Sequence, residues 1–432
     1  MSMRYIKLLL DFAAKTLYYI ERYKVSFDKA FHYALNDMKN KLKGYSLRRF
    51  YNVAWSNAVN YYKLRFIERQ IYRTTGGTKR LTRLWALYFG GEILNDIKNY
   101  SSFKRRIQRD LPKYVDLDNI LASFDLTDEE KLSVELSYPL WFTKLLVELL
   151  GVKEARELLK HMNIEKYWLR VNTLKIDVDK AIKQLEKNNV VVEKDKDLWY
   201  MLKVIEYKKP LYELNLVKEG SIIIQDKGSA LVVEALNPQP GDVIFDACAA
   251  PGIKTSLIMQ LTENKCKIIA ADISRDRIKS MLKLLRLYGV DLDRIDIIVL
   301  DSTKKVLRRN VHKALVDAPC SSSGTVSRDP AIKIHLNDVA WVKRFPQIQK
   351  RLLLSIAMQA EEIVYATCSL IPWEGEEVIE SVLSQAHLHL TTPTIIGDRG
   401  YSRYQRICAK VKRLYPHKHD VEGFFIAKFV KK

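Results

Sequence analysis

Two cysteines stand where a reactive thiol could work. Cys320 lies in LVDAPCSSSGT (315–325) and Cys368 in IVYATCSL (363–370). Each follows an apolar run typical of a buried strand, and its neighbours are Ser, Thr or Pro. A thiolate is a strong nucleophile, and the strand ends of open α/β sheets are where ligands bind, so such a pair suits covalent catalysis. The alternative is that both are small buried residues, the common fate of free cysteine.

A turn of small residues follows another apolar run. The stretch VIFDACAAPGIKTSLIMQL, residues 243–261, has the pattern of a strand, a turn and a helix. Small side chains let backbone amides approach a nucleoside or carboxylate at the helix N-terminus. The turn lacks the Gly-x-Gly-x-x-Gly pattern of dinucleotide sites and does not match a Walker loop. It predicts a nucleoside-type cofactor contacted by Cys248, Ala249, Ala250, Pro251, Gly252, Ile253 and Lys254.

Carboxylates end the following strands. Asp272, about twenty residues after Gly252, can accept hydrogen bonds from two ribose hydroxyls. Asp301 ends the third strand, where the adenine side of a nucleoside would lie. Either carboxylate alone is as often a helix cap or loop residue. Because three strand-end sites follow in order, we predict that Asp272, Arg277, Asp301 and Asp317 also contact the cofactor.

The chain is expected to be an α/β protein with two further regions before its main sheet. From about residue 220, strands and helices alternate, which is typical of a parallel, doubly wound, Rossmann-like sheet. Residues 216–432 are predicted to form this catalytic domain, and 126–215 a small α/β linker subdomain. The expected helices of that subdomain are 137–150, 153–162 and 179–187, and its expected strands are 167–171, 190–193 and 198–205. The expected strands of the main sheet are 243–246, 268–272, 297–300, 314–317 and 362–366.

Residues 1–125 are predicted to form an all-α, basic domain that ends in an acidic connector, residues 111–135. Apolar residues recur at intervals of three and four, as in Leu8-Phe12-Leu17-Ile20. Residues 1–110 hold 23 Lys and Arg against 8 Asp and Glu, which is +15 of the net charge of +21. Such an excess favours a polyanion such as RNA. The alternatives are a solvated helix surface or an anionic membrane, and tyrosines such as Tyr61 are more often core residues than stacking platforms.

Composition excludes several classes of protein. Hydrophobic residues make up 47% of the 432, enough for real cores. The five cysteines form no Cys-x-x-Cys pair, so we expect neither a disulfide framework nor a metal site. No run approaches the roughly 20 uncharged apolar residues that cross a bilayer. We therefore expect a soluble, cytoplasmic protein, monomeric and without a membrane partner.

Several motifs together resemble the Sun-type family of RNA cytosine-5 methyltransferases. DACAAPGIKT, DAPCSSSGTVSRDP and ATCSLIPWEGEE are similar to its central motifs. SYPLWFTKLLVELLG, RVNTLK, IIQDKGSALVVEAL and HDVEGFFIAKF resemble its other segments in the same order, so the likeness covers roughly residues 136–432. The helical region in front resembles, in arrangement and charge only, the NusB-like RNA-binding extension of bacterial ribosomal RNA members.

The resemblance implies a reaction. It implies S-adenosylmethionine as cofactor and methylation of carbon 5 of a cytosine in RNA, with ribosomal RNA favoured over transfer RNA. The attacking thiol would be Cys368, and Cys320 would assist product release. Asp317 would hydrogen-bond the base, and Lys254 would contact the same pocket. The target base must also turn out of its stack.

The sequence departs from the family pattern at four places. Ile253 and Ser322 stand where glycine is usual, IPWEGEE replaces Pro-Glu-Glu-Asn, and the loop before the last core strand shortens to residues 359–361. One alternative is a catalytically silent RNA-binding ribosome assembly factor, although both cysteines, Asp272 and Lys254 argue against it. Methylation of an exocyclic amine is disfavoured because Ala-Pro-Cys, rather than Pro-Pro and an aromatic residue, follows Asp317.

Overall fold

The computed structural model describes residues 3–115, 125–305, 307 and 310–431. The chain divides into two compact units. The helical unit runs to Ile164 and includes Val326–Trp341 from much later in the sequence. The sheet unit comprises Glu165–Thr325 and the chain from Val342 onward. The sequence therefore passes from the sheet unit into the helical unit and back between residues 325 and 342.

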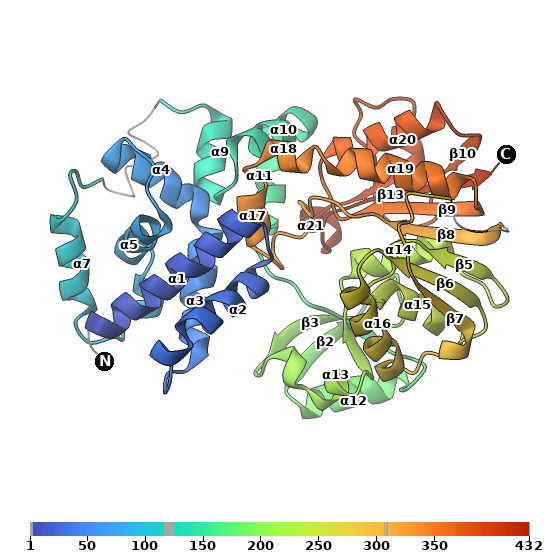
Figure 1. Ribbon diagram of the computed structural model, residues 1–432, viewed down its shortest axis with the longest axis horizontal. Helices are drawn as coiled ribbons and strands as arrows, with labels where there is room; N and C mark the ends of the chain where they lie inside the picture. Colours follow the sequence, from blue (N-terminus) through green and yellow to red (C-terminus); the bar gives the residue numbers. More distant parts are fainter. Residues whose placement is uncertain (1–2, 116–124, 306, 308–309, 432) are drawn as a thin grey trace. The chain divides into compact units, whose positions relative to one another are not determined.

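The helical unit is all-α (Figure 1). Its core is lined by the apolar stripe of α1 together with aromatic residues such as Phe27 and Phe50. A stripe at helical spacing buries itself against neighbouring helices, and this burial stabilises the bundle. The helices of its first 164 residues are α1 (Met3–Tyr23), α2 (Phe27–Met38), η1 (Lys39–Lys41), α3 (Leu47–Val59), α4 (Tyr61–Tyr72), α5 (Thr78–Tyr88), α6 (Gly91–Leu94), α7 (Tyr100–Arg109), α9 (Asp128–Leu136), α10 (Leu140–Leu150) and α11 (Val152–His161).

Two short helices from the later segment complete this unit, α17 (Ala331–His335) and α18 (Val339–Val342). Ala331 and Ile334 belong to the helical core. Between them Lys333, 1% exposed, donates from Nζ to the carbonyls of Val59 at 3.3 Å and Leu136 at 3.2 Å. These carbonyls are the last ones of α3 and α9, which carry partial negative charge. Lys333 thus links the C-terminal ends of two helices that lie far from α17 along the chain.

A four-stranded antiparallel sheet opens the sheet unit, in the order β2-β3-β1-β4. Its apolar face forms a small core that contains Leu169, Leu185 and Leu202. Its elements are β1 (Trp168–Val171), α12 (Val178–Lys187), β2 (Val190–Lys194), β3 (Met201–Tyr207), η2 (Leu211–Glu213), α13 (Asn215–Lys218) and β4 (Ile222–Ile224).

The large sheet has the order β11-β12-β13-β9-β8-β5-β6-β7, with β10 paired to β13. The five strands from β5 to β9 are parallel, and β10 to β13 pair antiparallel. Helices α14 and α19 pack against strands β8 and β9 from opposite sides of the sheet (Figure 1). The elements are α14 (Lys227–Leu236), β5 (Val243–Asp246), α15 (Ile253–Leu261), β6 (Lys267–Asp272), α16 (Arg275–Leu287), η3 (Leu292–Arg294), β7 (Ile295–Val299), β8 (Val311–Asp317), α19 (Phe345–Ala357), β9 (Ala360–Thr367), η4 (Pro372–Glu374), α20 (Glu376–Leu383), β10 (Leu388–Thr391), β11 (Asp398–Arg399), η5 (Cys408–Lys410), β12 (Val411–Leu414), α21 (Pro416–His419) and β13 (Phe424–Lys431).

The expected fold class is confirmed, while three local expectations were wrong. The connector 111–135 contains α9, which begins with a capping box between Thr127 and Glu130, and the acidic residues are its first turn. Its residues 116–124 lie outside the described residues. Strand β4 pairs with β1, so the small sheet extends past the expected boundary at 215/216. Helices α9 to α11 fall in the helical unit, because α9 packs on α4.

Candidate active site

The two thiol loops leave neighbouring strands of the large sheet. Strands β8 and β9 are parallel, with Asp317 level with Ala366, so both chains leave the sheet at the same edge. Cys320 follows β8 by three residues and Cys368 follows β9 directly. Their sulfur atoms are 3.2 Å apart, and both side chains are half-buried. Cys368 packs, partly buried, against an apolar core, but its sulfur faces that of Cys320 across two polar loops, so the arrangement favours a reactive pair over two packing residues.

A buried carboxylate holds both loops. Glu374, 0% exposed, accepts from the Ser321 amide at 2.8 Å and from the Ser321 hydroxyl at 2.5 Å. It also accepts from the Ser369 hydroxyl at 2.6 Å and from Gln349 Nε2 at 3.3 Å. Burial raises the pKa of Glu374, which these hydrogen bonds oppose. Since Ser321 and Ser369 each follow a cysteine, Glu374 fixes the distance between the two thiols.

A buried ion pair also supports the loop that carries Cys368. Arg413 on β12 pairs with Glu376 on α20 through Nη2 and Oε2 at 2.5 Å, and both side chains are fully buried. Arg413 Nη1 also donates to the carbonyl of Ser369 at 3.2 Å. Burial opposes the charge of Arg413, but Glu376 outweighs it, so the pKa of Arg413 is raised. Removing either partner would leave a buried charge unpaired.

Lys254 and Asp317 form a second charged pair beside the thiols. Lys254 is the second residue of α15 and Asp317 the last of β8. Lys254 Nζ lies 2.7 Å from Asp317 Oδ2. Burial favours the neutral amine, but the charge and hydrogen bond of Asp317 prevail, and the pKa of Lys254 is raised. A cation that stays charged next to a thiol favours the thiolate.

The two thiols differ in acidity. The hydrogen bond from Cys320 lowers the pKa of Cys368, and Ser322 and Lys254 assist it, while burial and the negative charge of Asp317 oppose it. For Cys320, the same hydrogen bond, burial and Glu374 together raise the pKa well above its usual range. The environment therefore favours Cys368 as the thiolate and Cys320 as the protonated partner.

Ser322 stands in a backbone conformation that favours glycine. Its φ is +58°, in the left-handed region, where a residue with a Cβ is strained. The Ser322 hydroxyl lies 3.5 Å from the Cys368 sulfur. Glycine is usual at this position in the family. Ser322 therefore places a hydroxyl beside the Cys368 thiol, which a glycine could not do.

The turn after β5 is held by polar side chains beneath it. Asp246, 1% exposed, accepts from the Thr255 hydroxyl at 2.7 Å, and burial raises its pKa to about 7. Ser302 donates to the carbonyl of Ala247 at 2.8 Å. Gly252 has φ +98°, and a Cβ there would stand 2.8 Å from Met281 Cγ. A glycine is therefore required where the turn enters α15.

The strand-end carboxylates lie at the same edge. Asp272, 3% exposed, accepts from the Ser274 amide at 2.9 Å and pairs with Arg277 Nη1 at 3.0 Å. Arg277 also donates to the carbonyl of Ala250, so it links Asp272 to the turn. Asp301 accepts from the amide and hydroxyl of Thr303, and these hydrogen bonds lower its pKa. Burial raises the pKa of the half-buried Cys248 in the turn.

Three supporting residues escaped the sequence analysis. Glu374 and Gln349 form the network under the thiols, and only the unusual IPWEGEE segment pointed toward the first. Arg170 on β1 is fully buried and donates to the Ile253 carbonyl at 3.0 Å and to the Ser256 hydroxyl at 2.7 Å. It braces the first turn of the helix that carries Lys254. Arg170 lies in the RVNTLK segment, which was matched as a family motif. Periodicity alone would not have shown that this strand carries a buried arginine.

Two cysteines that the sequence did not predict for the site lie apart from it. Cys266 is buried and contacts Thr262 and Met259, while Cys408 is half-buried and donates to the Gln405 carbonyl. In the helical unit, Tyr61 is buried and Arg65 pairs with Glu21 and Glu68, so these two residues have structural roles. Among the described residues, no group of three or more His, Cys, Asp or Glu could hold a metal ion. No described helix is both long and apolar enough to cross a membrane.

Comparisons with known proteins agree with this arrangement. The family model described as 16S rRNA methyltransferase RsmB/F matches residues 233–430, and the RsmF/B-like ferredoxin-like domain matches residues 138–205. The chain is 33% identical over 319 residues to the 28S rRNA (cytosine-C(5))-methyltransferase of Mus musculus, covering 70% of this chain and 40% of that protein. It is 30% identical over 312 residues to the 26S rRNA (cytosine-C(5))-methyltransferase nsun-5 of Caenorhabditis elegans, covering 65% of this chain and 70% of that protein.

The likeness extends to the whole fold of a solved structure. The crystal structure of PH0851 matches with a TM-score of 0.77 at 23% identity and covers 100% of both chains. In contrast, the chain spans less than half the length of four curated relatives, from 40% to 49%. The residues matched by the family model, 233–430, include the two thiol loops and the turn after β5.

Proposed function

The chain belongs to the RsmB/F family of rRNA cytosine-C(5)-methyltransferases, and we propose that it methylates carbon 5 of a cytosine in ribosomal RNA. The observation that carries this proposal is the thiol pair Cys320–Cys368 beside the Lys254–Asp317 ion pair. Relatives named for ribosomal RNA of both subunits support this substrate over transfer RNA. The basic helical unit supports an RNA partner.

The proposed cofactor is S-adenosylmethionine, which would supply an electrophilic methyl group. The residues present fit it by their chemistry. The nearly buried carboxylate of Asp272 offers acceptors for ribose hydroxyls, and the turn 247–252 offers backbone to a charged end. Arg277 already pairs with one oxygen of Asp272, so we assign it to positioning that carboxylate.

Carbon 5 of cytosine is a poor nucleophile until carbon 6 is attacked. We assign the attack to the Cys368 thiolate, whose sulfur forms a bond to carbon 6 and pushes electron density onto carbon 5. Asp317 accepts a hydrogen bond from the protonated ring, and Lys254, paired with Asp317, holds that carboxylate in position. The electron pair now on carbon 5 would form the new bond to the methyl carbon. The bond between that carbon and the sulfonium sulfur would break, so the cofactor would leave as the neutral thioether S-adenosylhomocysteine.

Release requires the reverse cleavage. The proton on carbon 5 leaves to a base, the carbon 6–sulfur bond breaks, and the electron pair returns to Cys368 as thiolate. Cys320, protonated and 3.2 Å away, can donate a hydrogen bond to that departing sulfur. While Cys368 is bonded to carbon 6 it carries no charge, so the largest cause that raises the pKa of Cys320 is absent. The lowered pKa of Cys368 thus suits it to attack as the thiolate, and the raised pKa of Cys320 suits it to assist release as the protonated thiol.

The direct test is sequencing of bisulfite-treated ribosomal RNA from cells with and without the gene. We expect a cytosine protected from conversion only when the gene is present, and transfer of labelled methyl to the same RNA by the purified protein. Binding of the cofactor with no protected cytosine and no transfer to any RNA would contradict the proposal. That outcome would favour a silent assembly factor.

A further inference from the structure

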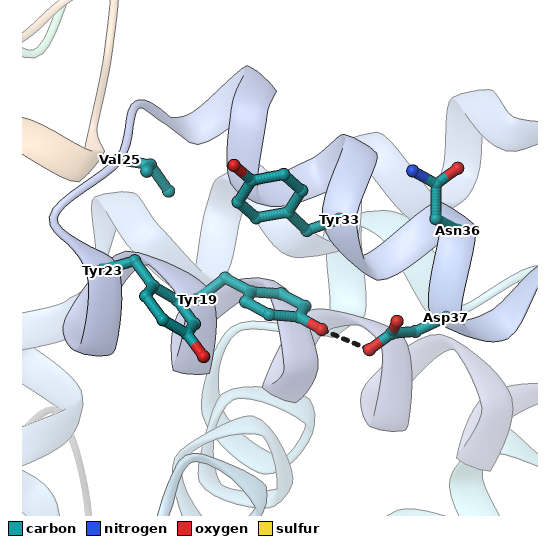
Figure 2. A pocket seen from close by; sticks show the side chains of 6 residues that line it. All are labelled: Tyr19, Tyr23, Val25, Tyr33, Asn36 and Asp37. Carbon is teal, nitrogen blue, oxygen red and sulfur yellow. Dashed lines mark hydrogen bonds between the residues drawn. The ribbon is translucent and has the colours of Figure 1, made fainter.

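A hollow of about 580 Å³ lies between α1 and α2 of the helical unit, far in sequence from the thiols. Its lining residues are Tyr19, Tyr23, Val25, Tyr33, Asn36 and Asp37. Figure 2 shows the three tyrosine rings grouped together, with the polar side chains of α2 at one end. The size of the hollow and its aromatic lining suit a planar ligand.

The rings offer faces and edges in different directions. Tyr19 and Tyr23 stack with centroids 5.8 Å apart and planes 28° apart, and Tyr33 meets Tyr19 edge-on at 5.3 Å. Tyr23 is 56% exposed. Other aromatic residues of this unit, such as Phe12 and Phe50, are instead fully buried in its core. A tyrosine that stays exposed next to two others is free to stack on an incoming ring.

The polar end of the hollow offers unused hydrogen-bonding groups. Asp37 Oδ2 accepts from the Tyr19 hydroxyl and pairs with Lys15 Nζ at 2.6 Å. Among the described residues, neither Asp37 Oδ1 nor the side-chain amide of Asn36 has a hydrogen-bond partner. A carboxylate oxygen accepts from the amino and imino groups of a nucleobase, and an amide both donates and accepts. Lys15 offsets the charge of Asp37, so a polyanion is not repelled here.

The surrounding charge selects among planar ligands. The hollow lies in the segment that carries +15 of the net charge. Lys24 comes directly before Val25 of the lining, and Lys29 Nζ stands 5.9 Å from the centre of the Tyr33 ring. Stacking rings within a basic surface are the usual means of holding single-stranded nucleic acid. We propose that this hollow binds an unpaired base of the RNA substrate, an inference that rests on the proposed function only in taking RNA as the partner.

The experiment measures binding of the full-length protein to single-stranded oligocytidylate without cofactor. Its second probe is an abasic ribose-phosphate oligomer of equal length, which has the same charges and no bases. We expect Tyr23→Ala with Tyr33→Ala to weaken oligocytidylate binding roughly tenfold and leave abasic binding unchanged. The salt dependence should not change, because no cationic side chain is removed. Tyr23→Phe with Tyr33→Phe should bind like the wild type, since it keeps both rings.

The matched control is Tyr18→Ala, which removes an exposed tyrosine of α1 that does not line the hollow. It should bind both probes like the wild type. Unchanged oligocytidylate affinity in a folded Tyr23→Ala, Tyr33→Ala variant would overturn the proposal, as would an equal loss on the abasic probe. The latter result would indicate that the tyrosines contact the ribose-phosphate backbone rather than a base. Since no methyl transfer is measured, failure of the proposed reaction would be recognised separately.

Discussion

The sulfur atoms of Cys320 and Cys368 lie 3.2 Å apart, although 48 residues separate them in the chain. Two parallel strands bring them to one edge of the sheet, and Glu374 binds the serine that follows each of them. The thiols are thus positioned by backbone pairing and by one buried carboxylate. Exchanging either thiol should therefore change chemistry more than structure.

Cys368→Ala should abolish methyl transfer while cofactor binding persists. The thiol forms the bond to carbon 6 in the proposed reaction, and it belongs to a different loop from the cofactor turn. Transfer of labelled methyl to RNA and calorimetric titration with S-adenosylmethionine check the two parts. Cys408→Ala, outside the site, is the control and should keep full activity. Turnover at the wild-type rate by the Cys368 variant would sink the assignment.

Cys320→Ala should accumulate a covalent RNA–protein adduct. Bond formation by Cys368 remains possible, but the hydrogen bond to the departing sulfur is removed. A denaturing gel with labelled RNA should show a retarded band. The double variant Cys320→Ala, Cys368→Ala should lack it, and an equal band there would show that the roles are misassigned.

Ser322→Ala should move the acid limb of kcat/KM to higher pH. The Ser322 hydroxyl helps to lower the pKa of Cys368, so removing it raises that pKa, and the thiolate then forms only at higher pH. Ser322→Gly should shift the limb in the same direction. It should also raise the free energy of unfolding by about 1 kcal/mol, because glycine accepts the positive φ without strain. A pH–rate profile and urea unfolding separate the two effects, and an unmoved limb in both variants would contradict the role of the hydroxyl.

Lys333→Met should remove part of the pH dependence of stability. Burial lowers the pKa of Lys333 well below its usual range. Between the lowered pKa of the folded state and the usual lysine value of about 10.4, the unfolded chain holds a proton on this amine that the folded chain lacks. Unfolding there takes up a proton, so this group makes stability increase with pH, by up to about 1.4 kcal/mol per unit, until the unfolded amine also loses its proton. Urea unfolding at several pH values should show that increase diminished in the variant. Lys153→Met, an exposed lysine of α11, should keep the wild-type increase.

Replacing Arg48, Lys104, Arg105 and Arg106 by Ala should weaken RNA binding and flatten its salt dependence. These side chains are exposed, so phosphates can reach them. Each phosphate that is no longer neutralised should reduce the log–log slope by roughly one. Arg49 is left unchanged because it pairs with Asp96 at 2.6 Å. Lys208→Ala with Lys209→Ala, exposed residues of the sheet unit, is the control, and an unchanged slope in the fourfold variant would mean that these charges only solvate the helical unit.

Strand periodicity and turn chemistry predicted the parallel strands and the meeting of the thiols. All five expected strands of the main sheet exist, because buried parallel strands are short apolar runs bounded by polar turns. The edge at which Lys254, Asp317 and both cysteines meet followed from that topology. The antiparallel strand β13 was matched only as a family segment.

Long-range polar contacts could not be predicted in the same way. Glu374 reaches Ser321 across 53 residues, and Arg170 reaches Ser256 across 86. Neither partner carries a periodic signal, because a buried hydrogen bond depends on two surfaces that meet only in the folded chain. The place of α17 in the helical core was missed for the same reason: its sequence lies inside the region that reads as α/β.

The insertion of residues 326–341 into the helical unit sets an order on biosynthesis. The carbonyl of Val59 accepts a hydrogen bond from Lys333, which is synthesised 274 residues later. At the usual rate of translation of about 5–20 residues per second, that interval lasts roughly 15–55 s. During it, the part of the helical core that Ala331 and Ile334 fill in the folded protein lacks these side chains. The helical unit therefore cannot finish folding first, as an N-terminal domain ordinarily does. Its last piece arrives only after the loop that carries Cys320 has left the ribosome, so the two units mature together.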